Sequence, residues 1–142
     1  MAQQEKIEIT VIATINAPVA KVWKTWTNPV DVMQWNNASD DWHTSHAEND
    51  LRAGGKFLYR MEAKDGSFGF DFEGRYDIVL EHELIEYTLA DERKVKISFF
   101  KDGNSTRVTE SFEAETENSI ELQQAGWQAI LNNFKKYTEQ AE

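Results

Sequence analysis

Residues 120–137, IELQQAGWQAILNNFKKY, carry the pattern that decides the fold. Large apolar side chains recur there in steps of three and four residues, which is the spacing of one face of an α-helix. These side chains are Ile120, Trp127, Ile130, Leu131, Phe134 and Tyr137. Polar residues occupy the other side, so the sequence predicts an amphipathic helix that must lie on an apolar surface. We expect the functional site in the core or cavity between this helix and that surface.

Before this helix, short runs alternate between apolar and polar residues and are separated by turn signals such as Asp65-Gly66. Alternation of this kind is typical of strands with one buried face. The runs cover residues 6–15, 57–63, 68–78, 85–89, 95–99 and 106–114. In the longest run, the residues expected on one face are Phe68, Phe70, Phe72, Gly74, Tyr76 and Ile78. The pattern predicts an antiparallel meander whose apolar face is covered by the helix.

Two short helices are predicted between the first two of these strands. Pro18 has the position of an early helical proline and is followed by apolar residues at helical spacing. Asn28 and Pro29 repeat this start signal, so a second helix is expected to run to about Trp35. A single continuous helix is disfavoured because Pro29 lacks the amide hydrogen that it would need. Residues 36–50 are polar, acidic and without period, and we interpret them as a loop.

The expected order is therefore a strand, two short helices, a run of strands and a long helix. This order is typical of an α+β domain in which an antiparallel sheet of about six to seven strands carries its helices on one side. The sheet must curve around the long helix to bury so many aromatic side chains. Residues 1–142 are interpreted as one domain, because no repeat or linker interrupts the pattern.

The composition restricts the classes of function. The chain has 142 residues, of which 40% are hydrophobic and 12% aromatic, enough for a folded core. Its net charge of −10 argues against nucleic acid and anionic membranes as partners, since both favour a basic surface. The absence of cysteine excludes disulfides and thiol chemistry. With no apolar run long enough for an export signal or a membrane span, the sequence favours a soluble cytoplasmic protein.

The stretch INAPVAKVWKTWTNPVDVMQW, residues 15–35, resembles the opening of proteins similar to the activator of heat-shock protein 90 ATPase. The later LRAGGKF at residues 51–57, the Asp-Gly hairpin, Glu73-Gly74, the strand containing Leu89 and Gly126-Trp127 continue the similarity. The resemblance extends over most of the chain. It implies the START-like (SRPBCC) superfamily, whose helix-grip fold is a curved sheet wrapped around a C-terminal helix.

Proteins of that superfamily carry lipids and sterols, bind plant hormones and flavonoids, cyclise polyketides or activate the chaperone, so the fold does not select one function. The resemblance implies a small hydrophobic ligand, aromatic or lipid-like, held in a cavity between the sheet and the long helix. A chaperone cofactor or protein-interaction module is an alternative. It is weakened because 142 residues leave no room for the extra N-terminal domain with which the eukaryotic activator docks. A polyketide cyclase-like enzyme is a second alternative. No cofactor is expected.

The candidate ligand-binding residues are those expected to converge between the sheet and the long helix. They are Trp35, Tyr59, Met61, Phe70, Phe72, Tyr76, Tyr87, Phe99, Glu110, Trp127, Leu131 and Phe134. An ordinary packed core is the alternative for the apolar members. The tyrosine hydroxyls favour a site, because they can orient a ligand and a core does not require them. Gly126 lies at the edge of the helix stripe, where a missing side chain either permits close packing or leaves room for a ligand.

Glu110 is the most unusual candidate. By period it shares a strand face with Val108 and Phe112, where a charge is costly unless it is paired. One interpretation is a cavity carboxylate that binds a polar ligand group, or that transfers a proton as the acid or base of a cyclase-like enzyme. The alternatives are a bulge or sheet edge that turns the side chain to solvent, and a salt bridge to a nearby arginine or lysine.

The polar segment before the second strand contains weaker signals. His43, His46 and Glu48 imitate a metal-binding pattern, but two histidines in a polar segment without cysteine favour a solvated loop, and no metal site is predicted. Trp42 is the better candidate for a side chain that covers the mouth of the pocket, because its neighbours are all polar. Trp26 is expected to pack its helix against the sheet.

Overall fold

The computed structural model describes residues 7–141, so Lys6, which the sequence pattern assigns to the first strand, lies outside the described residues together with 1–5 and 142. The elements are β1 Glu8–Ile15, α1 Val19–Thr27, α2 Pro29–Trp35, β2 Trp42–Asn49, β3 Lys56–Ala63, β4 Gly69–Leu80, β5 Leu84–Leu89, β6 Lys94–Asp102, β7 Ser105–Glu113 and α3 Ile120–Gln140. This order confirms the predicted strand, two short helices, run of strands and long helix.

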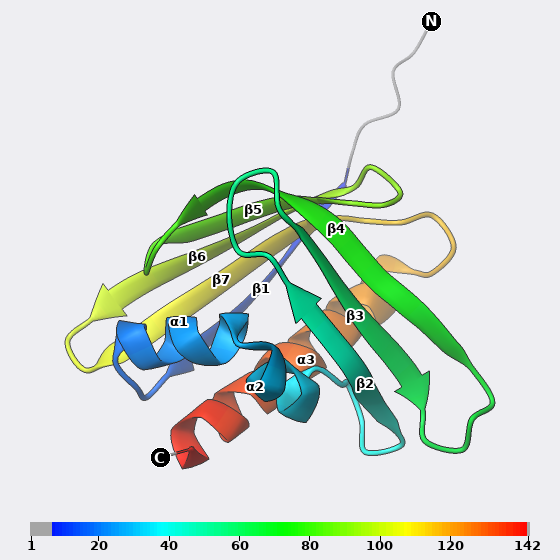
Figure 1. Cartoon of the computed structure of the whole chain (residues 1–142), viewed down its shortest axis with the longest axis horizontal. Helices are drawn as coiled ribbons and strands as arrows, with labels where there is room; N and C mark the ends of the chain where they lie inside the picture. The colour runs from blue at the N-terminus through cyan, green and yellow to red at the C-terminus, as the bar shows by residue number, and fades with distance from the viewer. Residues whose placement is uncertain (1–6, 142) are drawn as a thin grey trace, which may run out of the picture.

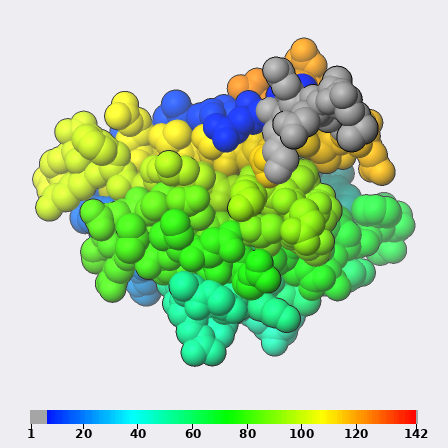
Figure 2. Space-filling view, turned by 90° about the horizontal axis from the view of Figure 1, so that it is seen from above, coloured from blue at the N-terminus to red at the C-terminus, as the bar shows by residue number. Residues whose placement is uncertain are grey.

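Within residues 7–141, seven strands form one antiparallel sheet in the order β1-β7-β6-β5-β4-β3-β2. The sheet curls, and all three labelled helices lie on its concave side (Figure 1). The opposite, outer face is shown in Figure 2, where residues of β4 to β7 run side by side across the surface. The α+β helix-grip architecture expected from the sequence is therefore confirmed.

The helix boundaries follow from local capping. The side chain of Asn28 accepts a hydrogen bond from the backbone nitrogen of Val30 at 3.1 Å, and Pro29 is the first residue of α2. The side chain of Ser119 caps α3 in the same way, accepting from the nitrogen of Leu122 at 3.1 Å. The chain between residues 18 and 35 consequently forms two short helices, as predicted.

The prediction of a loop throughout residues 36–50 is wrong, because β2 occupies Trp42–Asn49. This strand lies at the sheet edge and pairs with β3, and its register shifts between Thr44 and His46. Thr44 is buried and Ala47 packs against the core, three positions further on. The shift breaks the period of two, so the alternation that identifies a strand is absent from the sequence.

A second register shift interrupts β4 between Tyr76 and Ile78. Ile78 is 38% exposed, whereas Val79 packs against the core. The expectation that Ile78 shares the inner face with Tyr76 is therefore wrong beyond this irregularity, although Phe72 and Tyr76 do face inward. Phe68 precedes the strand and is exposed.

The core lies between the concave face of the sheet and the three helices. Leu131 and Phe134 of α3 are fully buried, with 0% of their surface exposed, and the rings of Trp26 and Trp35 pack edge-on against Phe134 at 4.9 Å. Along the described chain, no helix has the length and apolarity needed to cross a membrane.

Candidate ligand-binding site

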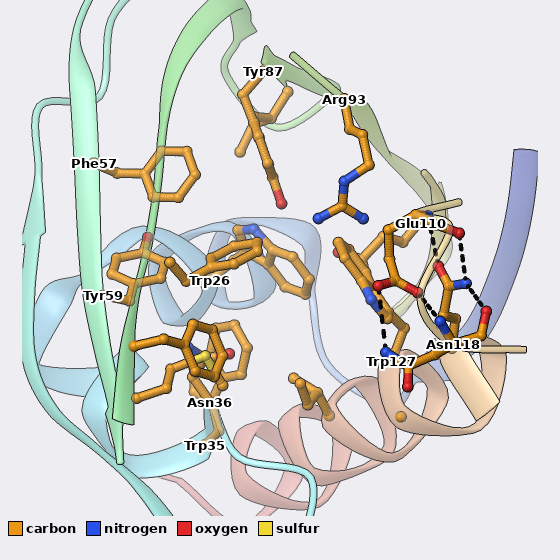
Figure 3. Close-up of a pocket in the computed structure, with 18 of the residues that line it drawn as sticks. Trp26, Trp35, Asn36, Phe57, Tyr59, Tyr87, Arg93, Glu110, Asn118 and Trp127 are labelled. Atoms are coloured by element: carbon orange, nitrogen blue, oxygen red, sulfur yellow. Dashed lines mark hydrogen bonds between the residues drawn. The ribbon is translucent and has the colours of Figure 1, made fainter. Parts of the chain in front are cut away.

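A pocket of about 370 Å³ lies between the concave face of the sheet and α3. In Figure 3, Tyr87 and Glu110 approach it from the sheet, Arg93 from the turn between β5 and β6, Trp127 from α3, and Trp35 and Asn36 from the end of α2. Nine of the twelve candidate residues line this pocket: Trp35, Tyr59, Met61, Phe70, Phe72, Tyr76, Tyr87, Glu110 and Trp127.

The pocket exists because α3 does not cover the sheet evenly. The helix packs closely on β1 and on the two short helices, while the inner faces of β3, β4 and β5 supply the opposite wall of the pocket. Gly126 borders this space from the helix. A Cβ atom placed on Gly126 would meet no atom within 4 Å, so the missing side chain leaves open space rather than a close helix–strand contact.

The remaining three candidates lie in the packed core and not in the pocket lining. Leu131 and Phe134 are fully buried members of the core, and Phe134 packs against Trp26 of α1 and Trp35 of α2. Phe99 packs edge-on against Trp23, with ring centroids 5.1 Å apart. The helical stripe seen in the sequence is thus divided between two roles, one part forming core and another part forming the pocket wall.

The walls of the pocket are held by contacts between aromatic rings. Phe57 packs against Tyr59, Tyr76 and Tyr87, with ring centroids 5.2, 5.3 and 4.8 Å apart. Across the pocket, Trp127 stacks on Phe112 at 3.8 Å with an interplanar angle of 11°. Rings that pack on other rings keep their orientation, so the apolar surface is preformed rather than assembled by a ligand.

The tyrosine hydroxyls are used in different ways. Tyr76 donates to Asn49 Oδ1 at 2.6 Å, and Tyr59 is hydrogen-bonded to Tyr76. Burial raises the pKa of Tyr59 to about 12, so it is neutral at physiological pH. Within residues 7–141 the Tyr87 hydroxyl has no hydrogen-bond partner, and it points into the pocket (Figure 3). Burial, followed by the nearby Glu110 charge, raises the pKa of Tyr87.

Glu110 lies in the regular part of β7, where it pairs with Val11 and Ile97 without a bulge. Only 6% of its surface is exposed. The carboxyl group makes no hydrogen bond and no ion pair with any residue in the range 7–141. Burial raises its pKa to about 8, because the charged form loses hydration without gaining a partner. The carboxyl group is therefore largely protonated at neutral pH.

Other polar groups at the same end of the pocket already have partners. Arg93 donates from Nε to Asp91 Oδ2 at 2.6 Å. The Gln123 side chain donates from Nε2 to the carbonyl oxygens of Glu115 and Asn118 at 3.1 and 2.9 Å. These contacts tie the segment before α3 to the helix. Gln123 therefore has little hydrogen-bonding capacity left for a ligand, in contrast to Glu110, whereas the Arg93 guanidinium, which also lines the pocket, keeps N–H groups that are not used in these contacts.

Several lining residues are missing from the sequence-based set, notably Trp26, Asn36, Phe57, Arg93, Gln123 and Ile130. Phe57 shares a strand face with Tyr59 and Met61, so its period is a signal that could have found it. Asn36 ends α2 as its C-cap residue. No pattern marks Asn36, because the direction of its amide depends on where the short helix stops.

The aromatic and histidine residues of β2 lie beside the pocket and not in its lining. Trp42 contacts Phe68 and Phe70, with ring centroids 6.0 and 6.1 Å apart. His43 Nε2 lies 3.7 Å from Glu62 Oε1. No three histidine, aspartate or glutamate side chains among the described residues are arranged to hold a metal ion.

A curved sheet gripping a C-terminal helix, with a pocket between them, defines the helix-grip class. The sequence of residues 16–139 matches the family described as activator of Hsp90 ATPase homolog 1-like protein. The chain belongs to this family.

Two solved structures show substantial sequence identity to the chain. The AHSA1-like protein from Aeromonas hydrophila is 42% identical with a TM-score of 0.88, over 94% of this chain and 92% of that one. Chr148 from Cytophaga hutchinsonii is 55% identical with a TM-score of 0.82, over 93% and 92% of the two chains. CV1439 from Chromobacterium violaceum, at 20% identity and a TM-score of 0.85 over 95% and 99%, shares the fold. No curated protein matches the sequence.

Proposed function

We propose that the chain binds a small hydrophobic ligand, aromatic or lipid-like, in the pocket between the sheet and α3. The observation that carries this proposal is the pocket of about 370 Å³, whose lining includes nine aromatic side chains and which is bordered by Gly126. An apolar, preformed cavity with a few polar groups is the usual form of a small-molecule site. Affinity would come from apolar area removed from water, at about 25 cal/mol per Å².

Replacing Trp127 or Phe72 by alanine is expected to abolish binding. The two rings meet edge-on at 6.1 Å and form adjoining parts of the wall, so truncating either removes apolar surface that the ligand would cover. The measurement is an amide-resolved NMR titration of wild type and variants with a panel of sterols, fatty acids, flavonoids and polyketide-like aromatics. Affinity that survives both substitutions would place the ligand elsewhere on the molecule.

Replacing Gly126 by leucine is expected to block binding without unfolding the protein. The new side chain would enter open space, and leucine has a higher helix propensity than glycine by about 0.5–1 kcal/mol. Ala125→Leu is the matched control, because Ala125 is exposed on the same helix. Thermal unfolding and the NMR titration should show a stable Gly126→Leu variant that no longer responds to ligands, beside a control that responds like wild type.

A chaperone cofactor is the second candidate, and the family description is the observation that favours it. The working surface would then lie outside the pocket, on the edge strand β2 and the acidic residues around it, which include Asp40, Asp41, Glu48 and Asp50. Stimulation of Hsp90 ATPase activity that is lost when these acidic residues are neutralised, yet unaffected by Gly126→Leu, would support this function. An ATPase rate unchanged by the wild-type protein would exclude it.

A further inference from the structure

Besides the Tyr87 hydroxyl, two buried polar side chains that line the pocket have no hydrogen-bond partner within residues 7–141: Asn36 and Glu110. Figure 3 shows them on different sides of the pocket, with Asn36 beside Trp35 and Glu110 beside Trp127. Buried polar groups are rarely left without hydrogen bonds, because losing water without a replacement partner is unfavourable. Because both side chains line the same pocket, a bound ligand would supply the hydrogen-bond partners that they lack.

The backbone of Asn36 is held by two hydrogen bonds, whereas its side-chain amide nitrogen makes none. Its N–H donates to the carbonyl oxygen of Val32 at 3.0 Å, and its carbonyl oxygen accepts from Thr44 Oγ1 at 2.6 Å. The side-chain Nδ2 is buried without a partner, and 8% of the residue is exposed. Because no side-chain hydrogen bond would be broken, the amide can rotate about χ2 and present its donor to the pocket at no hydrogen-bonding cost.

Glu110 is held equally firmly, since its strand pairs with β1 on one side and with β6 on the other. Its carboxyl group offers an acceptor oxygen in either protonation state. Arg93 does not neutralise it, because within the described chain no ion pair joins the two groups, and Arg93 is bound to Asp91. Glu110 is therefore available to a ligand as a hydrogen-bond acceptor.

We propose that the ligand is an elongated apolar molecule with a polar group at each end: a carbonyl oxygen that accepts from the Asn36 amide and a hydroxyl that donates to Glu110. The inference rests on the proposed function and adds the chemical class of the ligand. The aromatic rings between the two anchors would cover its apolar middle, and the anchors would fix its direction in the pocket.

The test compares probes that share a scaffold and differ only at their ends. Biphenyl is the apolar reference, and 4-acetyl-4′-hydroxybiphenyl carries both polar groups. Naphthalene and 6-acetyl-2-naphthol repeat the comparison on a shorter scaffold. For the scaffold whose length fits, two hydrogen bonds to buried partners should strengthen binding by about tenfold each. Dissociation constants are measured by NMR titration at constant pH.

The variants are Asn36→Leu and Glu110→Leu, which keep similar volume and remove the hydrogen-bonding atoms. In each variant the gain in affinity from the polar ends, measured as the ratio of the dissociation constants of the apolar and the doubly substituted probe, should fall about tenfold. Thr138→Val is the matched control. Thr138 Oγ1 is another buried atom without a partner among the described residues, but Thr138 does not line the pocket. The control should keep the wild-type preference for the polar probes.

The outcomes distinguish an error in the ligand class from an error in the proposed binding function. If biphenyl or naphthalene binds and the polar ends add nothing on either scaffold, or if the gain persists in both leucine variants, the ligand class is wrong while the binding function stands. If no probe of either length binds wild type, the proposed function itself is contradicted. Loss of the gain in the two variants alone, with the Thr138→Val control unchanged, supports the proposal.

Discussion

Replacing Glu110 by glutamine is expected to make the protein increasingly more stable than wild type as the pH rises from about 4.5 to above 8. Burial raises the pKa of Glu110 from 4.5 to about 8. Between these values the unfolded chain has released the proton while the folded chain retains it, so the stability of wild type falls as the pH rises. Glutamine remains neutral and removes this dependence. Below 4.5 both states of wild type are protonated, and the advantage of the variant disappears.

The expected effect is large. One pKa unit corresponds to about 1.4 kcal/mol, so a pKa raised from 4.5 to about 8 corresponds to a loss of about 4–5 kcal/mol in wild type above pH 8. Burial raises the pKa of Tyr87, which faces Glu110, so Tyr87 stays neutral in this range and adds no competing titration.

Urea unfolding at a series of pH values measures this difference directly. Glu73→Gln is the matched control, because Glu73 lies exposed on β4. Its stability should follow the wild-type curve. A Glu110→Gln variant whose stability also runs parallel to wild type over the whole range would show that the Glu110 carboxyl is hydrated or paired, and that it is not a free anchor in the pocket.

Replacing Phe134 by alanine is expected to lower the free energy of unfolding by about 3–5 kcal/mol. The Phe134 side chain is fully buried, with 0% exposed, and carries the edge-on contacts of Trp26 and Trp35 at 4.9 Å. Its removal leaves a cavity among rings that cannot collapse freely. Trp127 is only partly buried and borders the pocket, so Trp127→Ala should cost clearly less stability.

Urea unfolding of the two variants at one pH provides the measurement. The comparison tests whether the apolar stripe of α3 has a core part around Phe134 and a pocket part around Trp127. If Phe134→Ala cost less than Trp127→Ala, the division of the helix stripe would be reversed, and the space beside Gly126 would have to be filled by packing.

The fold could be predicted because its signals are local. The stripe on α3, the period of two in most strands and the start signals at Pro18 and Asn28 each depend on residues that are near in sequence. The exceptions are β2 and the second half of β4, where register shifts near Thr44 and after Tyr76 break the alternation. Where a strand loses its period at such a shift, its pattern resembles that of a loop.

The site could be predicted only in part. Periodicity shows which side chains share one face of a helix or strand, but it does not show whether each of them lies in the core or lines the pocket. Trp127 and Phe134 belong to the same predicted stripe, yet one lines the pocket and the other lies in the core. Glu110 was identifiable, since a charge in an apolar strand face is rare. Asn36 was not, because its role depends on the end of α2 and on the tertiary contact with Thr44.

The most direct test of the central claim is a set of intermolecular nuclear Overhauser effects between biphenyl and the side chains of the protein. A ligand between sheet and helix predicts contacts to Tyr59 and Phe72 from the sheet and to Trp127 from α3, and their loss in Gly126→Leu. Contacts confined to the outer face of the sheet or to exposed Phe68, or binding that survives Gly126→Leu, would contradict it.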